Sequence, residues 1–285
     1  LIIKRRIKMG LRIASNISSE QVQRNLKVSS RKLDEEFTKL SSGKRITKAA
    51  DDSAGLAIAT KLKAHTKGLS QAARNANDGI SLVQVAEGGL NEVSNIMVRL
   101  RELSVQAGTD TVGDQERELL NEEFSSLTTE VGRIAKSTKF NGRSLLGSET
   151  TDLTFKVTAE GGDDAGEGDV TFEKGETSVG ELDVLESDIS SKDGAQGAIN
   201  SVDEAINEVS KLRANFGATQ SRLTSTVSNL ESQIVNQKSA ISAIEDVDVA
   251  ASSARVASAN IVKSAGIATL SQANSGPASA LRLIN

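Results

Sequence analysis

Few residues in this sequence have types and spacings that could support catalysis. His65 is the only histidine and stands between Lys63 and Lys67 on a polar helical face, so a solvated side chain explains it better than a Ser-His-Asp triad. The absence of cysteine removes a disulfide framework, a thiolate zinc site and a thiol nucleophile. Ser81 with Gly88 and Gly89 forms no phosphate-binding loop, because no strand precedes these residues.

Two acidic clusters could suggest a metal site or paired catalytic carboxylates. The first cluster does not have the spacing of an EF-hand calcium loop, and a solvated acidic loop is the better interpretation; it comprises Asp163, Asp164, Glu167 and Asp169. The second is better explained by a helix N-terminus or an ion pair between helices; it comprises Glu245, Asp246 and Asp248. We therefore predict no catalytic residue, no metal site and no cofactor.

The composition disfavours an ordinary globular domain. The 285 residues include no tryptophan or tyrosine, six phenylalanines and a single proline. Leu, Ile, Val and Ala without large aromatic side chains suit the thin seams between parallel helices. A net charge of −4, with no basic patch and no interleaved aromatics, gives no support to a nucleic-acid partner. No run of 18 apolar residues is present to span a membrane.

The apolar spacing predicts long helices. We expect a first helix from Ile13 to Leu40 and a central helix that begins at Asp52 or Ser53 and ends near Gln106. A third helix over 115–136 has an apolar seam with gaps of 4, 3, 4 and 3, and it should lie antiparallel to the second. A fourth follows over 196–244. The segment 147–195 between the last two loses this period, and its short alternating runs predict one or two β-hairpins.

The two ends of the chain are apolar enough to pack but too weakly apolar to be stable alone. From Glu245 to Ala273, alanines and serines dilute the larger apolar residues. A buried Leu or Val contributes roughly 1.5–3 kcal/mol, whereas ordering each residue's backbone costs about 1–2 kcal/mol. Both ends should therefore be poorly ordered in a free monomer and fold when buried against neighbouring copies. This pattern predicts a polymerising subunit.

The basic stretch Leu1–Lys8 lacks the apolar segment and cleavage site of a secretory signal. Because Met9-Gly10 is a more natural start, we expect residues 1–8 to be an N-terminal extension.

Several long motifs, in order along the chain, resemble bacterial flagellin. They are Leu40-Ser41-Ser42-Gly43-Lys44-Arg45-Ile46, Ala49-Ala50-Asp51-Asp52, Arg74-Asn75-Ala76-Asn77-Asp78-Gly79-Ile80-Ser81, Arg101-Glu102-Leu103-Ser104-Val105-Gln106 and Phe140-Asn141-Gly142, with Ile244-Glu245-Asp246-Val247-Asp248 and Gln272-Ala273-Asn274 near the other end. The resemblance covers about 10–146 and 196–285, nearly the whole chain.

The resemblance implies a secreted structural subunit, exported unfolded through the flagellar type III channel, that forms the extracellular filament for motility. The expected fold is mainly α, with long antiparallel helical rods, terminal coiled-coil segments and a small β-hairpin insertion. The expected segments are 1–8 (extension), 9–44 (N-terminal filament-core coiled coil and connector), 45–146 (N-terminal rod helices), 147–195 (exposed β insertion), 196–244 (C-terminal rod helix) and 245–285 (C-terminal filament-core coiled coil).

The resemblance also implies two groups of functional residues. Those expected to mediate polymerisation are Val22, Leu26, Leu33, Phe37, Leu40, Ser42, Gly43, Arg45, Val256, Ile261, Ile267 and Leu270. Those matching the motif recognised by the Toll-like flagellin receptor are Arg99, Arg101, Glu102 and Leu103.

The implied partners are further copies of the chain or other flagellins, the flagellar export chaperone, and the cap and hook-junction proteins. Two alternatives remain open at this point: a hook–filament junction protein, and a helical signalling or scaffolding coiled coil. Salt-dependent fibres would favour the filament subunit, whereas ordered dimers would favour the scaffold.

Overall fold

The computed structural model describes residues 15–147, 153–158, 169–172, 179, 184 and 187–284. Its helices are α1 (Ile17–Ser42), α2 (Ser53–Ala107), α3 (Asp114–Ser137), α4 (Lys192–Glu245) and α5 (Val249–Ile284). The predicted mainly-α fold with a small β insertion is confirmed. None of the helices in these described ranges is long and apolar enough to cross a membrane.

The chain forms two compact units, which we describe separately. One consists of residues 1–63 together with 238–285, and the other of residues 64–237. The long helices α2 and α4 each contribute residues to both units.

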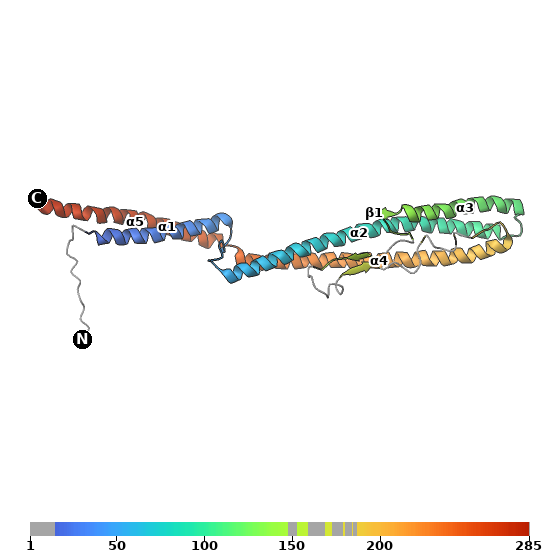
Figure 1. Cartoon of the computed structure of the whole chain (residues 1–285), viewed down its shortest axis with the longest axis horizontal. Helices are drawn as coiled ribbons and strands as arrows, with labels where there is room; N and C mark the ends of the chain where they lie inside the picture. Colours follow the sequence, from blue (N-terminus) through green and yellow to red (C-terminus); the bar gives the residue numbers. More distant parts are fainter. Residues whose placement is uncertain are drawn as a thin grey trace, which may run out of the picture. The chain divides into compact units, whose positions relative to one another are not determined.

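In the first unit, α1 lies beside α5 (Figure 1). The α1 helix begins where the Asn16 side chain accepts a hydrogen bond from the Ser19 amide at 3.1 Å. It ends at Gly43, whose φ of 69° is in the left-handed region that favours glycine. The predicted break after Leu40 is confirmed, two residues later than the apolar pattern indicates.

In the second unit, α2, α3 and α4 share one apolar core (Figure 1). Residues at helical spacing supply it, as the sequence predicts: Leu90, Val93, Met97, Leu100 and Leu103 from α2, Phe124 and Val131 from α3, and Val202, Val209 and Phe216 from α4. Met97 belongs to this seam and is fully buried.

The start of α2 and the end of α3 agree with the expected boundaries. Asp52 accepts a hydrogen bond from the Gly55 amide at 2.9 Å, which confirms an N-cap at this point. The α3 helix runs one residue beyond the expected 115–136 range at each end.

A buried arginine closes the turn between α2 and α3, and the sequence pattern gave no indication of it. Arg117 Nε donates to the carbonyl oxygen of Ala107 at 2.8 Å, and its Nη2 donates to that of Thr109 at 3.1 Å. The Ala107 carbonyl is the last of α2, where the helix supplies no further donor. The guanidinium also pairs with Asp114 at 2.9 Å.

Two small antiparallel hairpins follow α3. Strands β1 (Lys139–Phe140) and β2 (Arg143–Ser144) flank the predicted Asn-Gly turn, in which Asn141 and Gly142 both have positive φ. Strands β3 (Leu153–Phe155) and β4 (Val170–Phe172) confirm the predicted pair of alternating runs. The expected acidic loop between them lies outside the described residues, except for Asp169, which accepts a hydrogen bond from the Val157 amide at 3.2 Å.

The expectation of a solvated His65 is wrong. The ring is half-buried, and Gln237 Nε2 donates to its Nδ1 across 2.6 Å, from α4 to α2. The same glutamine accepts from the Thr66 hydroxyl at 3.0 Å through its Oε1. The polar helical face that the sequence shows is therefore partly an α2–α4 contact, because an exposed polar face and a polar helix–helix contact have the same spacing.

Candidate assembly surface

The α1·α5 pair is held by a thin apolar seam. Among the described residues, the buried hydrophobic side chains of these two helices are Leu33 and Val256. Gly266 of α5 lets the helices approach closely, since a Cβ added there would lie 3.3 Å from Leu26 Cδ1. By contrast, the shared core of α2, α3 and α4 contains several fully buried leucines and phenylalanines.

Hydrogen bonds fix the pair at the N-terminal end of α1. The side-chain amide nitrogen of Asn16, Nδ2, donates to the backbone carbonyl oxygen of Ala273 at 2.8 Å. The buried Ser19 hydroxyl donates to Asn274 Oδ1 at 2.8 Å. We call these four residues the polar clasp. Hydrogen bonds are directional, unlike apolar contacts, so the clasp selects one register for two helices whose seam is mostly small residues.

A charged contact fixes the pair near the C-terminal end of α1. Glu36 accepts from the Ser252 hydroxyl at 2.9 Å and from Arg255 Nε at 3.1 Å, and it pairs with Lys39 at 3.2 Å. Burial alone would raise the pKa of the Glu36 carboxyl. The hydrogen bonds from Ser252 and Lys39 and the nearby cations outweigh burial and leave the pKa below its usual value.

The two connectors beside this pair, 43–52 and 246–248, bind each other. The Arg45 amide donates to the carbonyl oxygen of Glu245 at 2.6 Å, and the Val247 amide donates to that of Gly43 at 3.0 Å. The nearly buried Glu245 carboxylate pairs with Lys44 at 2.8 Å through one oxygen and with Lys63 through the other. Hydrogen bonds from these lysines lower the pKa of Glu245. We call this group the connector clamp.

The clamp agrees with the interpretation of the second acidic cluster as an ion pair between helices. The Glu245 carboxylate at the end of α4 pairs with Lys44 of the 43–52 connector and with Lys63 of α2. Asp248 accepts a hydrogen bond from the Ala251 amide at 3.1 Å and so caps the start of α5. The expected ion pair and helix start are both present.

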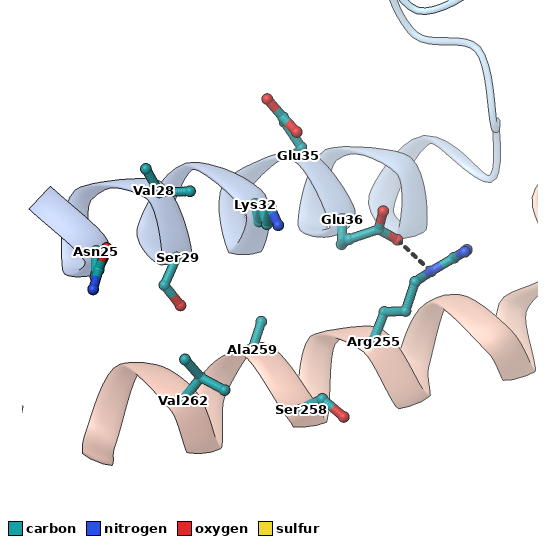
Figure 2. A pocket seen from close by; sticks show the side chains of 10 residues that line it. All are labelled: Asn25, Val28, Ser29, Lys32, Glu35, Glu36, Arg255, Ser258, Ala259 and Val262. Atoms are coloured by element: carbon teal, nitrogen blue, oxygen red, sulfur yellow. Dashed lines mark hydrogen bonds and ion pairs between the residues drawn. The ribbon is translucent and has the colours of Figure 1, made fainter. Parts of the chain in front are cut away.

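Large hydrophobic side chains remain exposed on the two paired helices. They are Ile17, Val28 and Phe37 on α1, and Val249, Ile261, Val262 and Ile267 on α5. Ile261 exposes 69% of its surface, more than any other large hydrophobic residue described. A groove of about 620 Å³ runs between the helices, with Val28, Lys32 and Glu35 on the α1 side and Ser258, Ala259 and Val262 on the α5 side (Figure 2).

The residues expected to mediate polymerisation are divided between the seam and the surface. Leu33 and Val256 are buried between the helices, whereas Val22, Leu26, Leu40 and Leu270 are half-buried. Phe37, Ile261 and Ile267 are exposed, and so are Ser42 at the end of α1 and Gly43 and Arg45 of the connector. The Arg45 guanidinium donates to the carbonyl oxygen of Ile244. The buried members pack between α1 and α5.

The four receptor-motif residues lie on α2 in the second unit. Arg99 pairs with Glu123 of α3 at 2.8 Å and with Glu102 at 3.0 Å, and Arg101 pairs with Asp203 of α4 at 2.6 Å. Leu103 is fully buried in the helical core. The partners Glu123 and Asp203 were not anticipated from the sequence, because single acidic residues on charged helix surfaces carry no distinguishing spacing.

Models of a known protein family match both helical regions of the chain. The family model for the bacterial flagellin N-terminal helical region matches residues 13–151, and that for the C-terminal helical region matches residues 199–284. A flagellin of Halalkalibacterium halodurans is 39% identical over 272 residues, covering 95% of this chain and 99% of the relative. A flagellin of Bacillus subtilis is 36% identical over 310 residues, covering 96% of this chain and 100% of the relative.

A crystal structure of Bacillus cereus flagellin has a TM-score of 0.47 and 27% identity, covering 59% of this chain and 94% of that chain. The two family models together span both helical regions of this sequence, and the relatives align over nearly their full lengths. The chain therefore belongs to the bacterial flagellin family.

Proposed function

We propose that copies of this chain polymerise through the exposed faces of the α1·α5 pair and the adjacent connector clamp. As a member of the flagellin family, the chain is a structural subunit of the flagellar filament, exported to form part of the extracellular flagellum. The proposal concerns which surface joins the subunits.

One observation carries the proposal: exposed large hydrophobic residues concentrate on this pair. Of the thirteen in the described part of the chain, seven lie on α1 and α5, whereas the buried hydrophobic residues described on these helices are Leu33 and Val256. A concentration of exposed apolar side chains on a soluble protein favours an interaction site. Small residues along α5 also allow helices of neighbouring copies to approach closely.

The proposal extends to the partners that the family resemblance implies. We propose that the export chaperone binds the apolar face of α5 before assembly, when that face has no neighbouring copy to cover it. We propose that the cap and hook-junction proteins contact the same terminal helices. For the Toll-like flagellin receptor, the outward-facing candidates are Arg99, Arg101 and Glu102, since Leu103 is buried.

Sedimentation of purified protein after addition of salt or filament seeds tests the assembly surface. Ile261→Asp should keep its helical circular dichroism but stay in the supernatant, because the charge would enter the proposed interface. Ile261→Leu is the matched control and should pellet as the parent does. Normal pelleting of Ile261→Asp would exclude this face of α5 from the interface.

Removal of both terminal segments provides a second test. A chain lacking residues 9–40 and 244–285 should remain soluble and helical, because the core of α2, α3 and α4 is retained. It should form no filaments at any concentration. Filaments from this trimmed chain would contradict the proposed role of the termini.

A further inference from the structure

The outer face of α1 carries its charges in two separate segments. Arg24, Lys27 and Arg31 are spaced three and four residues apart and share one helix face. Asp34 and Glu35 follow within the next turn. All five side chains are exposed. At 100° per residue Arg24 and Arg31 lie nearly opposite Leu33, which packs toward α5, while Lys27 and Asp34 lie toward one side. Glu35 borders the groove, and Figure 2 shows its carboxylate pointing away from α5.

These charges have no partner within the described part of the chain. The ion pairs of α1 involve Glu36 and Lys39, not any of the five residues named above. The α5 sequence contains no aspartate or glutamate, so α5 cannot neutralise the basic segment. Arg31 and Glu35 are one helical turn apart, yet they form no ion pair. Glu20, also exposed, lies one turn before Arg24, so the face carries a basic segment with acidic residues on both sides of it, Glu20 before and Asp34–Glu35 after.

We propose that the basic segment Arg24–Lys27–Arg31 of one copy binds the acidic segment Asp34–Glu35 of a neighbouring copy. The centres of the two segments are about seven residues apart, which corresponds to an axial offset of roughly 10 Å along α1. The contact thus sets a stagger between neighbouring α1 helices. This inference rests on the proposed function, because it assigns the polar part of the same assembly surface.

The order of the charges favours a second copy over other partners. An anionic polymer such as a nucleic acid would meet the carboxylates of Asp34 and Glu35 immediately after the basic segment. A second α1 helix in parallel orientation presents the complementary charge at both segments once it is shifted along its axis. A parallel, shifted contact is heterologous, so it leaves an unused basic segment at one end and an unused acidic segment at the other. Such a contact can repeat along a filament.

An antiparallel arrangement would also bring opposite charges together, but both segments of each copy would then be paired within one closed dimer. That pair would appear as a dimer and would not grow. The parallel stagger is therefore the arrangement compatible with a polymer.

Two block variants of the full-length chain test the contact. Lys27→Glu with Arg31→Glu reverses two of the three charges of the basic segment, and Asp34→Lys with Glu35→Lys reverses both charges of the acidic segment. Each variant alone should raise the critical concentration for polymerisation by roughly tenfold, because like charges then face each other between copies. The charge-conserving control, Lys27→Arg with Arg31→Lys, should polymerise as the parent does. Glu, Lys and Arg have similar helix propensities, so circular dichroism should show unchanged helix content.

Complementation distinguishes a specific contact from a general loss of solubility or folding. An equimolar mixture of the acidic and basic variants should co-pellet near the critical concentration of the parent. A chain carrying all four substitutions, which exchanges the two segments, should recover as well. The defects of the single-block variants should shrink as NaCl rises to about 0.5 M, where the Debye length is well below 10 Å.

Three outcomes would contradict the staggered contact between neighbouring α1 helices. Polymerisation of either block variant at the parental critical concentration would show that the segments do not meet. If neither the mixture nor the four-fold variant regained polymerisation, the substitutions would act by some means other than contact between the two charged segments. Stable dimers of the parent, suppressed by either block, would indicate the antiparallel pair. Failure of the unmodified chain to polymerise would instead refute the proposed assembly function itself.

Discussion

The Lys44 ammonium lies 2.8 Å from a carboxylate oxygen of Glu245, two residues that are 201 positions apart in the chain. Lys63 pairs with the other oxygen of the same carboxylate, whose side chain is only 4% exposed. A nearly buried carboxylate held by two cations loses more when one partner is removed than an exposed ion pair does. The contact joins the connector before α2 to the last residue of α4.

Glu245→Gln should loosen the connector clamp. Glutamine keeps the shape of the side chain but leaves Lys44 and Lys63 without their counter-charge. Hydrogen exchange should accelerate by about tenfold or more at the amides of Arg45 and Val247, which bond across the two connectors. Amides in the core of α3 should not change. Glu208→Gln, at a surface ion pair with Lys211, is the matched control and should leave all of these rates unchanged.

The stability that the Glu245 carboxylate contributes to the folded chain should decrease as the pH falls. Its carboxyl pKa is lowered in the folded chain from the ordinary value of 4.5, so it contributes stability above that pH. The contribution disappears as the pH falls through the lowered pKa. The difference between the parent and Glu245→Gln should therefore be full at pH 7 and decrease progressively below pH 4.5. A difference that grew on acidification would contradict the assignment.

Gly79 provides the space into which the β3–β4 hairpin packs on α2. A Cβ at this position would lie 3.0 Å from Phe155 Cδ1 and 3.1 Å from Leu223 Cδ1. Gly79→Val should lower the free energy of unfolding by about 1–3 kcal/mol through overpacking. Gly88→Val on the same helix is the control: no atom lies within 4 Å of its added Cβ, so the change should stay within about 0.5 kcal/mol. Chemical denaturation measures both.

The polar clasp should hold the first turns of α1. Asn16→Ala removes both the helix cap on Ser19 and the hydrogen bond to the Ala273 carbonyl. It should destabilise the start of α1 by about 1 kcal/mol and speed amide exchange there. Asn16→Asp keeps the side-chain oxygen that caps the helix but loses the side-chain amide donor. Its amide exchange rates at the start of α1 should therefore lie between those of Asn16→Ala and those of the parent. Equal amide exchange rates in all three proteins would show that the polar clasp does not fix the register of α1 against α5.

Dilute monomer should be cut by protease first within α1 and α5. Among the side chains described on the two helices, the buried large apolar ones are Leu33 and Val256, and their burial offsets little of the backbone entropy lost when the helices form. The fragment that survives should retain α2, α3 and α4, whose shared core is extensive. Polymerisation should protect the terminal helices. Protease resistance of both ends in dilute monomer would overturn the predicted marginal stability.

The helices, their approximate ends and the pairing of apolar seams within 64–237 could be predicted from the order of residues alone. Leu90, Val93, Met97 and Leu100 recur at the spacing of a helix face, and Asp52 and Gly43 are local signals of a helix start and stop. The family motifs also follow directly from residue order. Such signals act over one or two helical turns, so they are visible in a single stretch of sequence.

The pairing of polar residues could be identified only once the helices were placed side by side. Lys63 with Glu245, Gln237 with His65 and Asn16 with Ala273 are each separated by more than 170 residues, and no periodicity connects them. The tertiary structure also showed which members of one apolar stripe pack internally, such as Leu33, and which remain open to another copy, such as Phe37. The physical reason is that helical spacing specifies a face, whereas the arrangement of the other helices specifies what that face meets.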